Sequence, residues 1–180
     1  MRWTKLRKIL EEDRLCESLR GRVGYFLTHY HNAPDQYGRF CIRVDGKERL
    51  FANPYNEKYC FAEYAKIKQK FQIPPREWNG HGRFEFEEEN RWAEDAAAAK
   101  MMTENKMEIW QVMDAISEYL RLDIQAALRS ENEMIRLFAV LDRRVGKRTL
   151  ERLKEELEQQ PEWLQFFYRL RLESGRGGIK

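Results

Sequence analysis

The alternation of apolar and polar side chains before Asp45-Gly46 constrains the fold more than any other feature of this sequence. Residues 39–44 alternate in this way, which predicts a strand with one buried face. An Asp-Gly pair after such a run favours a β-hairpin, so residues 47–52 should return as the next strand. We expect a three-residue loop that contains Gly46, because this register sets Ile42 opposite Leu50 and keeps one apolar face.

The segments around this hairpin predict a mixed fold. Apolar residues at helical spacing predict one N-terminal helix over residues 4–19, capped by Thr4, and residues 23–31 are rich in strand-forming types. A further helix should start at Asn53-Pro54, and residues 83–86 are a candidate for a short fourth strand. We therefore expect an α+β fold, with an N-terminal helix on a three-stranded antiparallel meander (α-β-β-β-α), followed by a helical C-terminal half.

The sequence divides into four parts by composition. Residues 1–86 form the small α+β unit, and residues 87–102 form an acidic and alanine-rich helical connection. Residues 103–173 form a helical unit, and residues 174–180 form a glycine-rich, flexible tail. The acidic run in the connection lacks the spacing of a calcium-binding loop, so a solvated helix is expected there.

A dense group of basic residues lies between two apolar helical patterns, in the stretch from Asp142 to Arg148. Gly146 follows the first pattern, which favours a helix end with the glycine in the left-handed region. The predicted anion- or partner-binding residues at this corner are Arg143, Arg144, Lys147 and Arg148. A structural role competes with binding, because basic residues also satisfy carbonyls at a helix C-terminus and would pair with Asp142 or Glu151.

Two histidines give a weaker candidate site. His29 and His31 share one face of the predicted strand, and with Asp35 or His81 they could bind a metal ion or act as an acid–base pair. A metal ion needs at least three ligands in a defined geometry, and only two are placed here. We therefore expect no metal and no other cofactor. A surface of Tyr25, Tyr30 and Tyr37 mixed with Arg39 and Arg43 could alternatively stack on single-stranded bases, although core packing and sheet propensity explain the same residues.

The composition limits the classes of function. The chain has 180 residues and a net charge of +3 from 33 basic and 30 acidic residues, which makes no general case for nucleic acid. No apolar run is long enough to span a membrane, and no secretory signal follows the N-terminus. Three cysteines without a CxxC pair favour reduced thiols in a cytoplasmic protein. No catalytic motif is recognisable.

Several segments resemble an uncharacterised family of small soluble bacterial proteins. They are residues 2–6, 15–19, 21–23, 141–148 and 162–171, the last with its Trp-Leu-Gln-Phe-Phe-Tyr-Arg-Leu run. The resemblance implies a soluble bacterial protein, and it implies no activity, cofactor or catalytic residue.

These patterns favour a non-enzymatic binding or adaptor protein that engages another protein through the basic corner. A nucleic-acid-binding protein that uses the same cations is the first alternative. A metal-dependent or hydrolase-like enzyme centred on His29 and His31 is the second. Oligomeric state and partner identity do not follow from the sequence.

Overall fold

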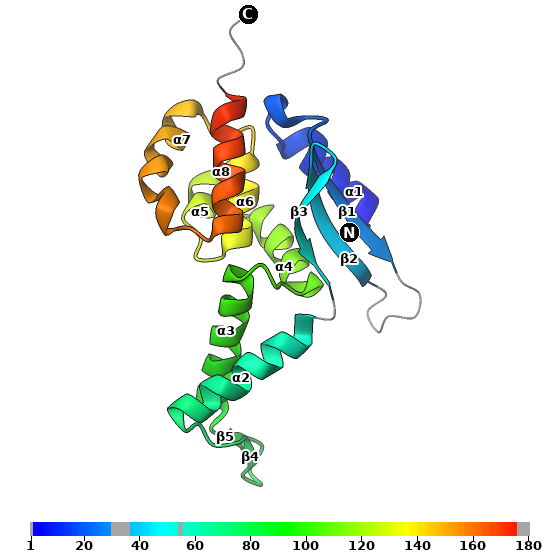
Figure 1. The fold of residues 1–180 in the computed structure, drawn as a ribbon. Coiled ribbons are helices and arrows are strands. Elements are labelled where there is room, and N and C mark those ends of the chain that lie inside the picture. The colour runs from blue at the N-terminus through cyan, green and yellow to red at the C-terminus, as the bar shows by residue number, and fades with distance from the viewer. Residues whose placement is uncertain (1, 30–36, 54–55, 176–180) are drawn as a thin grey trace, which may run out of the picture.

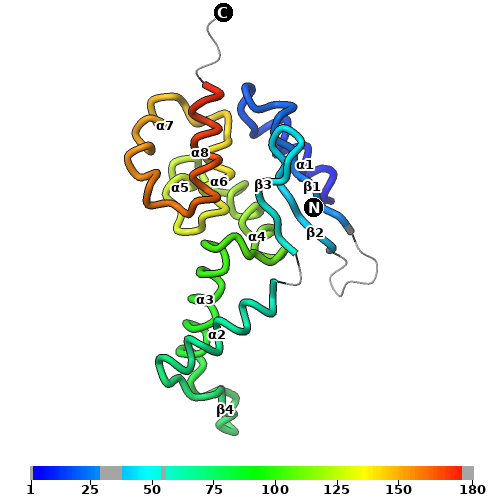
Figure 2. Tube along the Cα trace, viewed as in Figure 1, coloured from blue at the N-terminus to red at the C-terminus, as the bar shows by residue number. Residues whose placement is uncertain are grey.

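The computed structural model describes residues 2–29, 37–53 and 56–175. A three-stranded sheet packs against a group of helices to form a body, and a pair of helices projects from this body as an arm (Figures 1 and 2). One continuous core joins the sheet to the N-terminal and C-terminal helices. The predicted α+β class, with its N-terminal helix, antiparallel meander and helical C-terminal half, is confirmed.

The N-terminal helix is shorter than the sequence predicts. Helix α1 covers Trp3–Lys8 and continues into a π-helical turn, η1, at Ile9–Arg14, and a 3-10 turn, η2, follows at Glu17–Leu19. The prediction of one helix capped by Thr4 is wrong, because Arg2 is the N-cap residue and the backbone is extended at Leu15. Leu15 leaves the helix to form a β-bridge with Asp142, which no local pattern could indicate.

Strands β1 (Val23–His29), β2 (Tyr37–Val44) and β3 (Lys47–Ala52) form an antiparallel sheet in that order. The predicted pairing of Ile42 with Leu50 is confirmed, but the expected three-residue loop is wrong. The turn has two residues, Asp45 and Gly46, both with positive φ, as a type I′ hairpin turn requires. A bulge after Ile42 supplies the extra residue that keeps the apolar face aligned.

The two faces of the sheet differ in chemistry. Tyr25, Ile42 and Leu50 are buried on the inner face, and the Tyr25 ring lies 5.9 Å from that of Phe138. On the outer face Arg39 and Arg43 both pair with Glu48. The idea that Tyr25 joins these arginines in a base-stacking surface is therefore wrong, because Tyr25 faces the core. Tyr30 lies outside the described residues.

The C-terminal half is helical, as predicted. Asn132 caps the start of α6, since its side chain accepts hydrogen bonds from the backbone N–H groups of Met134 and Ile135. The elements are α4 (Ile109–Tyr119), α5 (Ile124–Leu128), α6 (Glu133–Leu141), α7 (Lys147–Leu153), the 3-10 segment η4 (Lys154–Gln159) and α8 (Glu162–Ser174).

The arm consists of helices α2 (Glu57–Phe71) and α3 (Glu87–Thr103), with a small hairpin of β4 (Glu77–Trp78) and β5 (Phe84–Glu85) at its tip (Figure 1). Residues 83–86 therefore do not add a fourth strand to the main sheet, because β5 pairs only with β4. The acidic and alanine-rich segment forms α3, as predicted. One face of α3 packs on α2 rather than facing solvent, and its buried residues include Ala93, Ala97 and Met101.

Polar contacts hold the two arm helices together. Arg76 makes bidentate hydrogen bonds of 2.8 and 2.9 Å to Glu94 and a third, of 2.7 Å, to Glu87. Lys100 donates to Glu63 over 2.6 Å. The side chain of Asn90 is fully buried and accepts a hydrogen bond of 2.6 Å from the Tyr64 hydroxyl. The arm therefore has a small interior of its own, in which polar side chains lie beside apolar ones.

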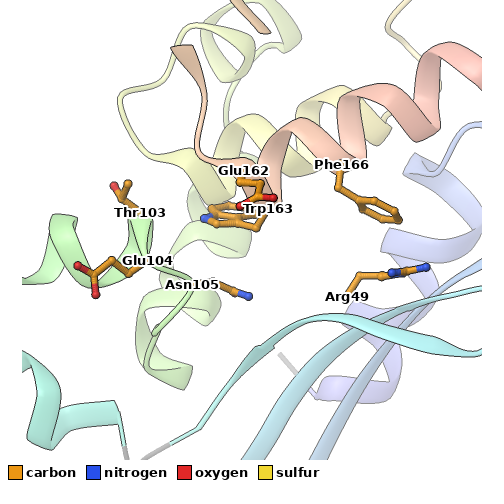
Figure 3. A pocket seen from close by; sticks show the side chains of 7 residues that line it. All are labelled: Arg49, Thr103, Glu104, Asn105, Glu162, Trp163 and Phe166. Carbon is orange, nitrogen blue, oxygen red and sulfur yellow. The ribbon is translucent and has the colours of Figure 1, made fainter. Parts of the chain in front are cut away.

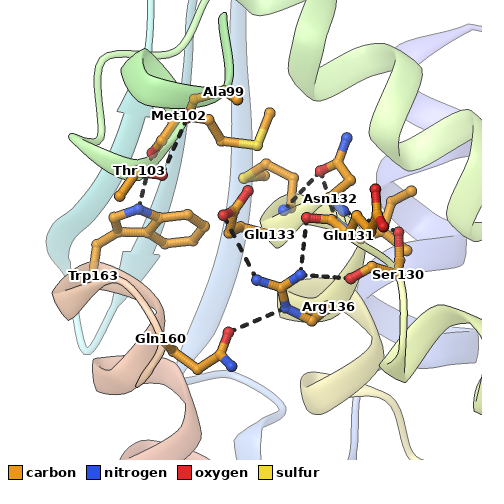
Figure 4. Close-up of polar contacts among 12 residues, drawn as sticks. Ala99, Met102, Thr103, Ser130, Glu131, Asn132, Glu133, Arg136, Gln160 and Trp163 are labelled. Atoms are coloured by element: carbon orange, nitrogen blue, oxygen red, sulfur yellow. Dashed lines mark hydrogen bonds and ion pairs between the residues drawn. The ribbon is translucent and has the colours of Figure 1, made fainter. Parts of the chain in front are cut away.

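The two ends of the arm join the body close to each other. Ala52, at the end of β3, forms a parallel β-bridge with Met107, and the Asn56 side chain donates to the Met107 carbonyl over 2.7 Å. On the α3 side, the Trp163 indole N–H donates to the Met102 carbonyl over 3.0 Å (Figure 4). These contacts fix the root of the arm to the sheet and to α8.

Candidate binding surfaces

A buried carboxylate organises the basic corner. Asp142 follows the last residue of α6 and has no exposed surface. It accepts hydrogen bonds from the Tyr119 hydroxyl at 2.5 Å, from the Arg144 backbone N–H at 2.7 Å and from the Arg144 guanidinium at 2.6 Å. Burial, followed by the hydrogen bond to Asp142, raises the pKa of Tyr119 well above its ordinary value, so this tyrosine stays a hydrogen-bond donor.

The corner is also tied to the N-terminal segment. The Arg143 backbone N–H donates to the Arg14 carbonyl over 2.6 Å, and the Cys16 N–H donates to the Leu141 carbonyl over 2.9 Å. From α8, Arg171 donates to the Val145 carbonyl over 3.0 Å. Contacts from three separate parts of the chain therefore hold the bend in one conformation.

The glycine of the corner does not adopt the expected conformation. Gly146 has φ −80° and ψ 163°, so the prediction of a left-handed glycine is wrong. It is the N-cap residue of α7, and α6 ends earlier, at Leu141, where Asp142 turns the chain. A methyl group added at Gly146 would meet no atom within 4 Å. The change of direction thus depends on Asp142 and not on the conformational freedom of glycine.

The four predicted basic residues fall into two groups. Arg144 pairs with Asp142, so much of its charge is neutralised inside the protein. Arg143, Lys147 and Arg148 are exposed, and their side chains make no ion pair or hydrogen bond within the described part of the chain. The corner therefore presents three free cations on a rigid bend, which is compatible with an anionic partner.

The structure describes only part of the histidine site that the sequence predicts. His29 is the last residue of β1, whereas His31 and Asp35 lie outside the described residues. His81 is exposed in the turn between β4 and β5. Figure 1 shows this hairpin at the tip of the arm, away from the main sheet. Over residues 2–29, 37–53 and 56–175, no group of three or more His, Cys, Asp or Glu residues is placed to hold a metal ion.

A pocket of about 430 Å³ opens where the sheet, the root of the arm and α8 meet (Figure 3). The Arg49 guanidinium lies 4.7 Å from the centre of the Phe166 ring, in a cation–π contact. Asn105 has φ 58°, and its side-chain oxygen is buried without a hydrogen-bond partner among the described residues. Glu104 and Glu162 also line the pocket, so its charges are mixed and select no single class of ligand.

The arm carries most of the exposed apolar surface. Seven of the nine large hydrophobic side chains that are exposed in the described residues lie between residues 57 and 103. The most exposed are Phe61, at 62%, and Trp78, at 60%. Two edge-to-face pairs lie on this surface, Phe71 with Trp92 at 5.0 Å and Trp78 with Phe84 at 5.2 Å. The sequence analysis missed this surface, because it placed α2 in the small α+β unit with the sheet and treated α3 as a solvated connection.

The fold and the surfaces thus define a mixed α+β protein with a helical arm that carries exposed aromatic side chains. The chain belongs to the SF0329 protein family, whose model matches residues 2–172. All the segments that carried the resemblance in the sequence lie inside this match. Comparisons with curated proteins and with solved structures found no match. In the described residues, no helix combines the length and the apolar character needed to cross a membrane.

Proposed function

We propose that this is a non-enzymatic binding protein that docks a protein partner on the arm. The observation that carries the proposal is the concentration of exposed aromatic side chains on α2, α3 and the β4–β5 hairpin. Aromatic side chains are enriched at the centres of protein interfaces, where each supplies a large, rigid contact area. Clustered exposure of this kind marks an interaction surface, whereas isolated exposed apolar residues are ordinary.

The position of the arm supports the same function. It projects from the body, so a partner can reach the outer faces of both helices (Figure 2). The main core includes Met102 from the end of α3 but no residue of α2. Full burial of one aromatic side chain is worth roughly 2 kcal/mol. A partner that covers Phe61 and Trp92 would therefore gain free energy that the isolated chain leaves unused.

The basic corner supports a second candidate function, binding of an anionic partner or a nucleic acid. The supporting observation is a set of three exposed cations on a rigid bend, whose side chains pair with no other residue that the structure describes. They are Arg143, Lys147 and Arg148. Arg144 belongs to the internal ion pair with Asp142. Binding at the corner would weaken as salt is raised, because contacts to phosphates release counterions.

Site-specific photocrosslinking separates the two candidates. A photoreactive phenylalanine analogue would replace Phe61 on α2, Trp92 on α3, Arg143 at the corner or, as a body control, Arg152 on α7. Each full-length protein would be irradiated in a lysate of cells that naturally make it, with and without nuclease. We expect nuclease-resistant protein adducts from position 61 or 92 and none from position 152. Adducts from position 143 alone would overturn the arm proposal, and their loss with nuclease would indicate nucleic acid.

A further inference from the structure

We infer that the segment bound by the arm is a basic amphipathic helix, held on the acidic outer face of α3 and in the groove where α3 meets α4 and α6. This inference rests on the proposed function and names the chemistry of the partner.

The groove is an apolar hollow with an acidic rim. It has a volume of about 270 Å³, and Ala98, Ala99 and Met102 of α3 line it together with Trp110 of α4. Figure 4 shows Ala99 and Met102 on one side and Asn132 and Glu133, at the start of α6, on the other. The Trp110 ring is 54% exposed, and its indole N–H donates to Glu108 over 3.0 Å, which fixes one edge of the ring.

The carboxylates around the groove lack internal partners. Asp95, Asp114 and Glu131 line it, and none of their side chains makes an ion pair or hydrogen bond within the described part of the chain. Glu133 is the exception, with a contact of 3.7 Å to Arg136. Three free carboxylates beside an exposed indole suit a Lys or Arg side chain, because the ring face attracts cations and the carboxylates pair with them.

The outer face of α3 extends the groove along the arm. Glu88, Trp92, Asp95 and Ala99 follow one another at spacings of four, three and four residues, so they lie on one face of the helix. Trp92 is 49% exposed, and Glu88 has no ion pair among the described residues. This face thus repeats the chemistry of the groove, with apolar side chains flanked by free carboxylates.

A helix is the occupant that matches this pattern. The stripe follows a helix of 17 residues, about 25 Å long, and continues into the groove. A partner helix with apolar residues at i, i+4 and i+7 and cations beside them would place apolar side chains on Trp92, Ala99 and Met102. Its cations would then face Asp95, Asp114 and Glu131. The protein carries a net charge of +3, so overall charge would not attract such a helix, and its binding would depend on this local acidic surface.

A pair of designed peptides tests the inference on the full-length protein. One is a fluorescein-labelled helix of leucine and lysine with a heptad apolar stripe, and the other carries glutamate in place of every lysine. Fluorescence anisotropy would give the affinities, and ¹⁵N NMR would locate the binding site. We expect the basic peptide alone to bind, with the largest chemical-shift changes near residues 92–99, 110–114 and 131–133.

Charge reversal supplies the specific control. The double variant Asp95→Lys/Asp114→Lys should weaken binding of the basic peptide about tenfold or more, since it removes two ion pairs and replaces each with a like-charge contact. Glu151→Lys/Glu158→Lys makes the same change of net charge on exposed residues of the body and should leave affinity within about twofold. Trp110→Ala should also weaken binding without any change of charge. Equal losses in both double variants, or shifts mapped elsewhere, would overturn the inference.

The outcomes separate this inference from the proposed function. Photocrosslinks from position 61 without peptide binding on α3 would leave the arm as a docking surface but reject the basic helix. Absence of crosslinks from positions 61 and 92 would reject the proposed function, whatever the designed peptides do. An adduct from position 92 whose mass is that of two copies of the chain would identify α2, with its four lysines, as the basic helix.

Discussion

At the residue scale, Asp142 illustrates how one buried carboxylate determines a bend in the chain. It accepts hydrogen bonds from Tyr119 and Arg144, and the backbone beside it bonds to residues 14–16. Burying a charge without a partner costs free energy. The side chains of Asp142, Tyr119 and Arg144 are therefore stable in this arrangement only as a hydrogen-bonded group. The corner that the sequence suggested as a ligand site is therefore first a structural element, and Arg143, Lys147 and Arg148 are the exposed cations beside it.

Asp142→Ala should destabilise the protein by about 3 kcal/mol or more, because it leaves the Tyr119 hydroxyl buried and unpaired and releases Arg144. Arg143→Ala is a matched control one position away, since its exposed side chain has no partner among the described residues, and it should change stability by less than about 0.5 kcal/mol. Urea unfolding followed by circular dichroism measures both values. Similar effects of the two changes would contradict the role given to Asp142.

At the scale of the elements, local patterns located the body but not the arm. The pairing of Ile42 with Leu50 could be predicted because alternation and an Asp-Gly turn are local signals. The cap at Asn132 is a local signal too. The burial of Asp142 and the docking of α3 on α2 depend on residues distant in the sequence. Asn90 and Glu63, which are polar, lie inside the arm, so hydrophobic periodicity gave little sign of this packing.

The ion pairs of the arm make its stability depend on pH. Hydrogen bonds from Lys100 and from Arg76 lower the pKa values of Glu63 and Glu94, respectively, below the ordinary value of 4.5. A carboxylate whose pKa is lower in the folded than in the unfolded protein stabilises the fold at pH values above its ordinary pKa. This contribution is lost as the pH falls through the lowered pKa of the folded state. We therefore expect the arm to loosen in acid while its exposed aromatic residues remain attached to a folded body.

¹⁵N NMR spectra recorded from about pH 7 to about pH 3 would detect this change as lost dispersion in residues 57–103 before the rest of the chain. The variant Glu63→Gln/Glu94→Gln should show a weakened arm at every pH, because its amides cannot replace the ion pairs. Simultaneous loss of the arm and the body signals in the wild-type protein would contradict an independently weakened arm.

At the scale of the whole molecule, the chain is one body with an inserted arm. The core joins the sheet to α4, α6 and α8, and the bridge between Leu15 and Asp142 links the two ends of the body. The arm leaves after β3 and returns before α4, where Ala52 and Met107 are paired. Aromatic surface is concentrated on the insertion, while the body carries the basic corner.

Replacing residues 64–99 by a short glycine–serine linker should leave the body folded, because Glu63 and Lys100 are in contact across the arm. The chemical shifts of β1–β3 and of α4–α8 should match those of the full chain, and the melting temperature of the body should change little. A control that removes the bridge at the root, by deleting residues 52–56, should unfold the protein. Unfolding of the linker variant would show that the arm belongs to the folding unit.

Because the two ends of the arm are paired at its root, substitutions on the arm and substitutions in the core of the body have different consequences. Substitutions on the outer faces of α2 and α3 change the exposed surface of the arm without altering the main core of the body. The two ends of the arm already meet at its root, so a change in the length of the arm need not move the elements of the body. A family with this architecture can therefore vary the exposed surface of the arm on an unchanged body, as other proteins vary loops on a rigid scaffold.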